Sequence, residues 1–85
     1  MNRTTINADM TEIDRKFEEL GWEKSFHPYA LVYENCESSY PQRIEFIYDN
    51  QTVCCECYVR ERWRAMEIDK TLANLIVEKV KELNW

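Results

Sequence analysis

The chain of 85 residues carries 11 basic and 16 acidic side chains, one histidine, one glycine and four cysteines, and 45% of its residues are hydrophobic. This composition suits one small folded domain and is richer in apolar residues than a disordered segment. Because Gly21 is the only glycine and His27 the only histidine, the chain cannot form a glycine-rich phosphate loop, a dinucleotide-binding fingerprint or a two-histidine zinc site. A formal net charge of −5 argues against general affinity for nucleic-acid backbones.

Residues 1–8 are polar and show no periodicity, so we expect a flexible arm there and a single domain over residues 9–85. The longest apolar runs fall far short of the roughly 20 residues that span a bilayer, and the N-terminus lacks the apolar core of a signal peptide. We therefore expect a cytoplasmic protein.

The first helix is predicted from apolar residues that recur at helical spacing and form one stripe. Asp9 or Thr11 can cap its start, and Thr11 with Asp14 has the spacing of a capping box. Gly21 can end it in a left-handed conformation, with Trp22 folding back on the helix. The stripe consists of Met10, Ile13, Phe17 and Leu20.

Alternation of apolar and polar residues predicts strands over 29–34, 43–49 and 52–60. A two-residue turn at Asp49 and Asn50 would join the last two strands. The alternative turn at Asn50 and Gln51 would set Glu45 opposite Glu56, and like charges directly opposed are destabilising. We prefer the first turn, which pairs Phe46 with Val53, Ile44 with Cys55, and Arg43 with Glu56.

The third strand should turn Val53, Cys55, Cys57 and Val59 toward the core and Cys54, Glu56 and Tyr58 away from it. Beyond it the arginines alternate with other residues, so the strand either continues or restarts as a fourth, edge strand.

A C-terminal helix is predicted from a second apolar stripe, with Asp69 as its N-cap and Ile68 at the hydrophobic-staple position. Its end, KELNW, repeats the pattern EELGW of the first helix, which indicates the same capping chemistry with Asn84 in place of Gly21. The predicted fold is α+β, an antiparallel three- or four-stranded meander covered on one face by an N-terminal and a C-terminal helix. The second stripe consists of Leu72, Leu75, Ile76, Val80 and Leu83.

Four segments, DRKFEELGWEK, YALVYEN, RIEFIYDNQTV and KVKELNW, together resemble a group of short uncharacterised proteins of Gram-positive bacteria and their phages. The resemblance covers nearly the whole chain and implies a mobile-element setting with no established activity. The cysteine-rich strand and the arginine run lie outside the shared pattern.

The cysteines supply enough ligands for a zinc site, but their spacing argues against one. Side chains of Cys55 and Cys57 would stand about 6.5 Å apart on a strand, whereas two thiolates on one zinc approach to about 3.8 Å. Adjacent and i, i+2 cysteines also fail the geometry of a disulfide. We expect reduced cysteines, no metal and no cofactor, and the alternative is a thiol or metal site built on Cys54, Cys55 and Cys57. Nothing in the sequence brings His27 to Cys36 as a base for a nucleophile, so we expect no enzymatic activity.

Charged residues provide two candidate surfaces for a partner. The first is an acidic face, made of Glu12, Glu18, Glu19, Glu34 and Glu37. The second is a basic row of Arg60, Arg62 and Arg64, whose guanidinium groups would project from one face of a strand, with Trp63 between them in the sequence. The alternative interpretation of this row is a solvent-exposed edge strand whose charges prevent aggregation.

These features predict a small, non-catalytic binding module of phage or mobile-element type. We expect it to act by contact with a host protein that presents a basic surface, without direct binding to nucleic acid or membrane. Its most specific form is inhibition of a nucleic-acid-handling host defence enzyme, in the manner of anti-CRISPR proteins. The competing hypotheses are the thiol or metal site and a structural domain that self-associates through its edge strand.

Overall fold

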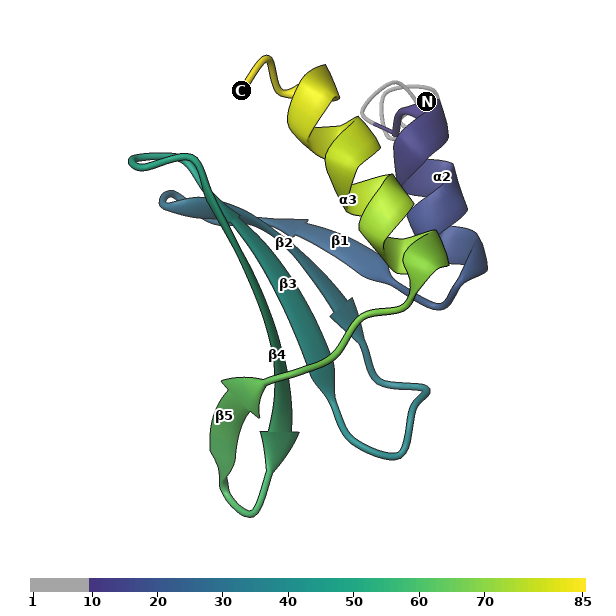
Figure 1. Cartoon of the computed structure of the whole chain (residues 1–85), viewed down its shortest axis with the longest axis vertical. Coiled ribbons are helices and arrows are strands. Elements are labelled where there is room, and N and C mark those ends of the chain that lie inside the picture. The colour runs from purple at the N-terminus through teal and green to yellow at the C-terminus, as the bar shows by residue number, and fades with distance from the viewer. Residues whose placement is uncertain (1–9) are drawn as a thin grey trace, which may run out of the picture.

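The computed structural model describes residues 10–85, so the predicted arm over residues 1–8 and the candidate cap Asp9 lie outside the described residues. An N-terminal helix, a five-stranded antiparallel meander and a C-terminal helix confirm the α+β class (Figure 1). In chain order the elements are α2 (Glu12–Glu19), β1 (Glu23–Phe26), β2 (Ala30–Asn35), β3 (Gln42–Ile47), β4 (Thr52–Val59), β5 (Arg62–Ala65) and α3 (Lys70–Glu82). Within residues 10–85, neither helix is long and apolar enough to cross a membrane.

The sheet has five strands, and the prediction of three or four was wrong. The strand β1 has the sequence EKSF, which contains no β-branched residue and follows the first helix directly, so it gave no strand signal. The strand β5 is a separate edge strand, because Arg60 and Glu61 adopt φ angles of 54° and 64° and reverse the chain after β4. Such a pair of left-handed residues forms the tight turn that suits a two-residue hairpin.

Both ends of α2 use the predicted capping chemistry. The Thr11 hydroxyl accepts from the Asp14 amide at 3.1 Å, while the Asp14 carboxylate accepts from the Thr11 amide at the same distance. Gly21, with φ 94°, then allows the Trp22 amide to donate to the Phe17 carbonyl at 3.0 Å.

The second helix repeats this pattern. Asp69 caps its start by accepting from the Leu72 amide at 2.9 Å. Asn84, with φ 64°, replaces the glycine at its end, and the Trp85 amide donates to the Val80 carbonyl at 3.2 Å. The sequence echo therefore reflects shared capping, as predicted.

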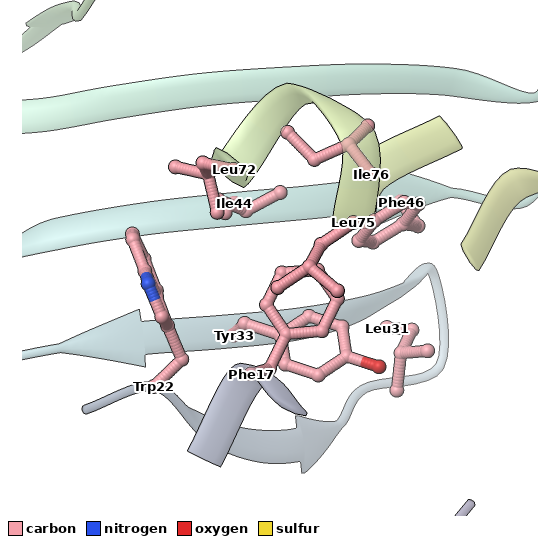
Figure 2. Close-up of a cluster of buried hydrophobic side chains, with 9 residues drawn as sticks. All are labelled: Phe17, Trp22, Leu31, Tyr33, Ile44, Phe46, Leu72, Leu75 and Ile76. Carbon is pink, nitrogen blue, oxygen red and sulfur yellow. The ribbon is translucent and has the colours of Figure 1, made fainter. Parts of the chain in front are cut away.

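The hydrophobic core lies between the two helices and one face of the sheet (Figure 2). Phe17 stacks on Tyr33 with ring centroids 4.4 Å apart, and Phe46 meets Tyr33 edge-on at 5.7 Å. Leu20 was predicted in the core stripe but is 45% exposed, because it lies at the end of α2. The buried cluster consists of Phe17, Trp22, Leu31, Tyr33, Ile44, Phe46, Leu72, Leu75 and Ile76.

The pairing of β3 with β4 confirms the preferred register, with Arg43 opposite Glu56 and Phe46 opposite Val53. The connection differs in detail, because residues 48–51 form a four-residue loop in which Gln51, with φ 54°, takes the left-handed conformation. The core face of β4 is only half-buried: Val53 and Cys55 pack against the cluster without being enclosed.

Candidate functional site

Only one face of the sheet is covered by the described helices, and the opposite face forms the first candidate surface (Figure 1). Side chains alternate along strands, and directly paired residues share a face. One row of paired residues therefore crosses the uncovered side of the sheet, and it consists of Glu23, Glu34, Arg43, Glu56 and Ala65. A second row contains Ser25, Val32, Glu45 and Cys54. We call this surface the open face; Trp63 and Tyr58 complete it at its β4–β5 end.

The charge of the open face is negative. Its strands contribute four glutamates, Glu23, Glu34, Glu45 and Glu56, against one arginine, Arg43. Glu23 lies directly opposite Glu34, and both are exposed. Neither of these two carboxylates forms an ion pair within residues 10–85. Such an opposed pair costs about 0.2–1 kcal/mol, which a bound cationic group would relieve.

Arg43 is held in place at the centre of the open face. Its Nη2 lies 2.9 Å from Glu56 Oε1, and its guanidinium carbon lies 3.9 Å from the centre of the Trp63 ring. Its Nε is buried without a hydrogen-bond partner and lies 3.9 Å from Glu45 Oε1. The stack and the ion pair fix both Arg43 and Trp63, because each restricts the rotamers of the other.

Aromatic side chains lie around this arginine. Tyr58 meets Trp63 edge-on with centroids 5.3 Å apart and keeps 40% of its surface exposed. Tyr29, which precedes β2, is 52% exposed, and its hydroxyl donates to Glu45 at 3.4 Å. Val32 is buried although it belongs to the same face, so the accessible surface is formed by the longer side chains around it.

The five carboxylates predicted to form one acidic face do not form one surface. Glu12 begins α2, Glu18 and Glu19 lie in its last turn, and Glu34 belongs to the open face on the other side of the sheet. Glu37 lies in the loop after β2, where its Oε1 would come within 3.0 Å of a Cβ at Gly21.

The predicted basic row is divided as well. Arg60 lies in the β4–β5 turn, while Arg62 and Arg64 lie on β5 opposite Val59 and Cys57, on the helix side of the sheet. Trp63 points to the open face instead. The expectation that three guanidinium groups project from one strand face was therefore wrong, because the chain turns at Arg60.

The cysteines within residues 10–85 are all free, and no group of three or more metal-ligating side chains occurs in this range. Cys54 belongs to the open face, and Cys55 lies on the core side, where burial and the neighbouring Cys54 raise its pKa. His27 and Cys36 flank opposite ends of β2, so they do not meet.

A buried polar cluster around Asp14 was missed by the sequence analysis. Asp14 Oδ2 lies 2.6 Å from Lys24 Nζ, and Oδ1 lies 3.0 Å from Lys79 Nζ and accepts from the Tyr33 hydroxyl. Lys79 also contacts Glu82 Oε2 at 2.5 Å. Asp14 and Lys79 are each only 2% exposed.

The contacts within this cluster stabilise the ionised form of Asp14. Burial opposes ionisation of Asp14, but hydrogen bonds from Lys24, Tyr33, the Thr11 amide and Lys79 keep the pKa of its carboxyl well below the ordinary value. Burial and the adjacent carboxylate raise the pKa of Tyr33. This arrangement joins α2, β1, β2 and α3 through one buried carboxylate. A sequence signal existed for Lys79, because it falls on the apolar stripe of α3.

No family model matches the chain, and neither the curated proteins nor the solved structures searched contain a match. The resemblance to short phage and Gram-positive proteins therefore stays a prediction, and the surfaces of the α+β fold are the basis for inferring a function.

Proposed function

We propose that the protein is a non-catalytic binding module that docks the open face of its sheet on a basic surface of another protein. The observation that carries this proposal is the uncovered sheet face, on which four glutamates stand against one arginine. Opposite potentials across an interface accelerate encounter and select against partners of the wrong charge.

The open face is favoured over helix α2 by its charge balance. On α2, Arg15 and Lys16 lie between Glu12 and the pair Glu18 and Glu19. Lys16 Nζ also lies 3.6 Å from Glu78 on α3. Mixed charges of this kind produce a weak field beyond the screening length of about 8 Å at physiological salt. Among the predicted acidic residues, Glu34 is the one that the open face retains.

The composition of the open face supports the same proposal. Trp, Tyr and Arg are the residues that dominate binding energy at protein interfaces, and Trp63, Tyr58 and Arg43 lie together here. Because Arg43 is already fixed by Glu56 and Trp63, its ordering costs little additional entropy on binding.

The partner that we propose is a protein that uses its basic surface to bind another ligand. Enzymes that handle nucleic acids have such surfaces, because phosphate backbones attract Lys and Arg clusters. Inhibition by occlusion of a nucleic-acid site is the specific form of this proposal.

Two charge-reversed double variants test which surface binds. Tagged Glu23→Lys/Glu34→Lys changes the open face, and Glu12→Lys/Glu18→Lys changes α2 by the same formal charge. Each would be used to capture partners from a host lysate at moderate ionic strength. We expect a stoichiometric partner that the wild type and the α2 variant retain and the open-face variant loses by at least about tenfold.

The opposite pattern, or retention by both variants, would contradict the proposal. A triple variant, Arg60→Ser, Arg62→Ser and Arg64→Ser, tests the arginines. If this variant loses the partner while both glutamate variants retain it, the arginines bind the partner instead. Thermal melts check that each variant is folded, and the pair Glu23→Gln/Glu34→Gln replaces the lysine version if that version unfolds early.

A further inference from the structure

A groove runs across the end of α2, the segment between β5 and α3, and the first turns of α3. One hollow of about 350 Å³ is lined by apolar residues that include Trp22, Met66 and Leu72 and by polar residues that include Asn35 and Gln42. A second hollow of about 410 Å³ lies against Leu75 and Asn74. Because Leu20 and Thr71 line both hollows, we treat them as one feature, the linker groove.

The linker groove exposes apolar surface that the fold does not use. Leu20 is 45% exposed and Ile68 is 39% exposed, and both line the first hollow. Trp22, at 4% exposure, also lines this hollow, and its amide donates to the Phe17 carbonyl in the helix cap. The volume of the first hollow falls at the lower end of the range of about 300–1,000 Å³ typical of ligand pockets.

The charge around the groove is acidic. Glu67 and Asp69 line the first hollow, and Glu19 lines the second together with Lys16, whose ammonium lies 3.6 Å from Glu78. Glu37 approaches the same end of α2 beside Gly21. Apolar lining residues with carboxylates beside them complement an apolar side chain that has cationic neighbours.

We propose that the linker groove binds one large apolar side chain, Leu or Trp, of a peptide segment in which the neighbouring residues are Lys or Arg. The side chain enters the first hollow over Trp22 and Leu72, and the cations lie against Glu67 and Glu19. Gln42, which lines the hollow and forms no side-chain hydrogen bond within the described residues, supplies an amide for the backbone of the segment.

This site is separate from the open face, because its lining residues belong to the helix side of the molecule. A second copy of the chain is a poorer occupant than a basic segment, since a net charge of −5 makes copies repel one another. The proposal therefore does not depend on the function proposed for the open face.

The test uses short acetylated peptides and amide NMR spectra of the wild-type protein. Three peptides carry Trp, Leu or Ala between pairs of lysines, and a fourth carries Trp between pairs of glutamates. We expect the lysine peptides with Trp or Leu to shift the amides of Leu20, Trp22 and Ile68, with affinity at least about tenfold higher than that of the Ala peptide. The glutamate peptide should leave these amides unshifted.

Matched variants make the result specific. Leu20→Asp should reduce the affinity for the Trp–lysine peptide at least about tenfold, while Val77→Asp, at a residue that is 51% exposed and outside both hollows, should leave it within about twofold. The pair Glu23→Gln/Glu34→Gln should also leave it within about twofold, so failure at the groove and failure at the open face are distinguishable.

Three outcomes would overturn the proposal. The first is the absence of shifts at the groove at millimolar peptide, and the second is equal binding of the Ala and Trp peptides. The third is a wild-type dimer in sedimentation experiments that Leu20→Asp converts to a monomer, because the groove would then be occupied by a second copy of the chain.

Discussion

Asp14 and Lys79 are separated by 65 residues in the chain, and their side chains meet at 3.0 Å in the buried region between α2 and α3. Lys24 and Tyr33 bind the same carboxylate from β1 and β2. Four elements therefore share one buried anion, and removing a single cation leaves charge that the interior cannot solvate.

Replacing Lys79 by Met should lower the free energy of unfolding by about 3 kcal/mol, because it breaks a buried ion pair. The matched change Lys81→Met, at an exposed residue of the same helix, should cost less than about 0.5 kcal/mol. Urea unfolding measures both. The double variant Asp14→Asn/Lys79→Met should lose less than the sum of its single variants, and simple additivity would show that the two groups are not coupled.

Stability should fall in acid because of Asp14. Its folded pKa lies below the ordinary value of 3.8, so the ionised carboxyl stabilises the fold above about pH 4, and this stabilisation is lost as pH decreases toward the folded pKa. The difference in unfolding free energy between wild type and Asp14→Asn should shrink as pH is lowered from 6 to 2. A constant difference over this range would contradict the assignment. Because Glu82 also contacts Lys79, the comparison is repeated in a Glu82→Gln background.

Gly21→Ala should destabilise the fold by about 1–2 kcal/mol. A φ angle of 94° is unfavourable for a residue that has a Cβ. The new Cβ would also approach Glu37 Oε1 at 3.0 Å and the Asn35 side-chain amide at 3.3 Å. The matching change Asn84→Gly, at φ 64° at the end of α3, should be neutral or slightly stabilising. Thermal melts distinguish the two, and an unchanged midpoint for Gly21→Ala would show that the cap does not need glycine.

The turn between β4 and β5 offers a test of the strand that the sequence left undecided. Arg60 and Glu61 hold left-handed conformations, which Asn and Gly adopt at lower cost. Arg60→Asn/Glu61→Gly should therefore raise the free energy of unfolding by about 0.5–1 kcal/mol. A decrease would indicate that β4 continues through these positions instead of turning.

Much of the fold was predictable, because capping residues and apolar periodicity are local signals. Phe17, Ile76 and the β3–β4 register could be inferred from spacing and from the opposition of Arg43 to Glu56. The strand β1 could not, since its four residues have neither length nor β-branched side chains.

The surfaces were harder to predict than the elements. Glu34 was identified as a partner-binding candidate, but the face it occupies depends on strand pairings with β1 and β3 that were not known. Lys79 fell on an apolar stripe, which indicates burial. Its partner Asp14 could be found only by knowing that α2 and α3 pack together.

Binding of the partner to the open face can be measured through the reactivity of the chain's own cysteines. Cys54 lies on the open face, whereas the exposed Cys36 follows β2 near Asn35, which lines the linker groove. Alkylation of each thiol would be followed by mass spectrometry for the free protein and for its complex with the captured partner. We expect the partner to slow modification of Cys54 several-fold and to leave the rate at Cys36 unchanged. Protection of Cys36 with full reactivity at Cys54 would contradict it.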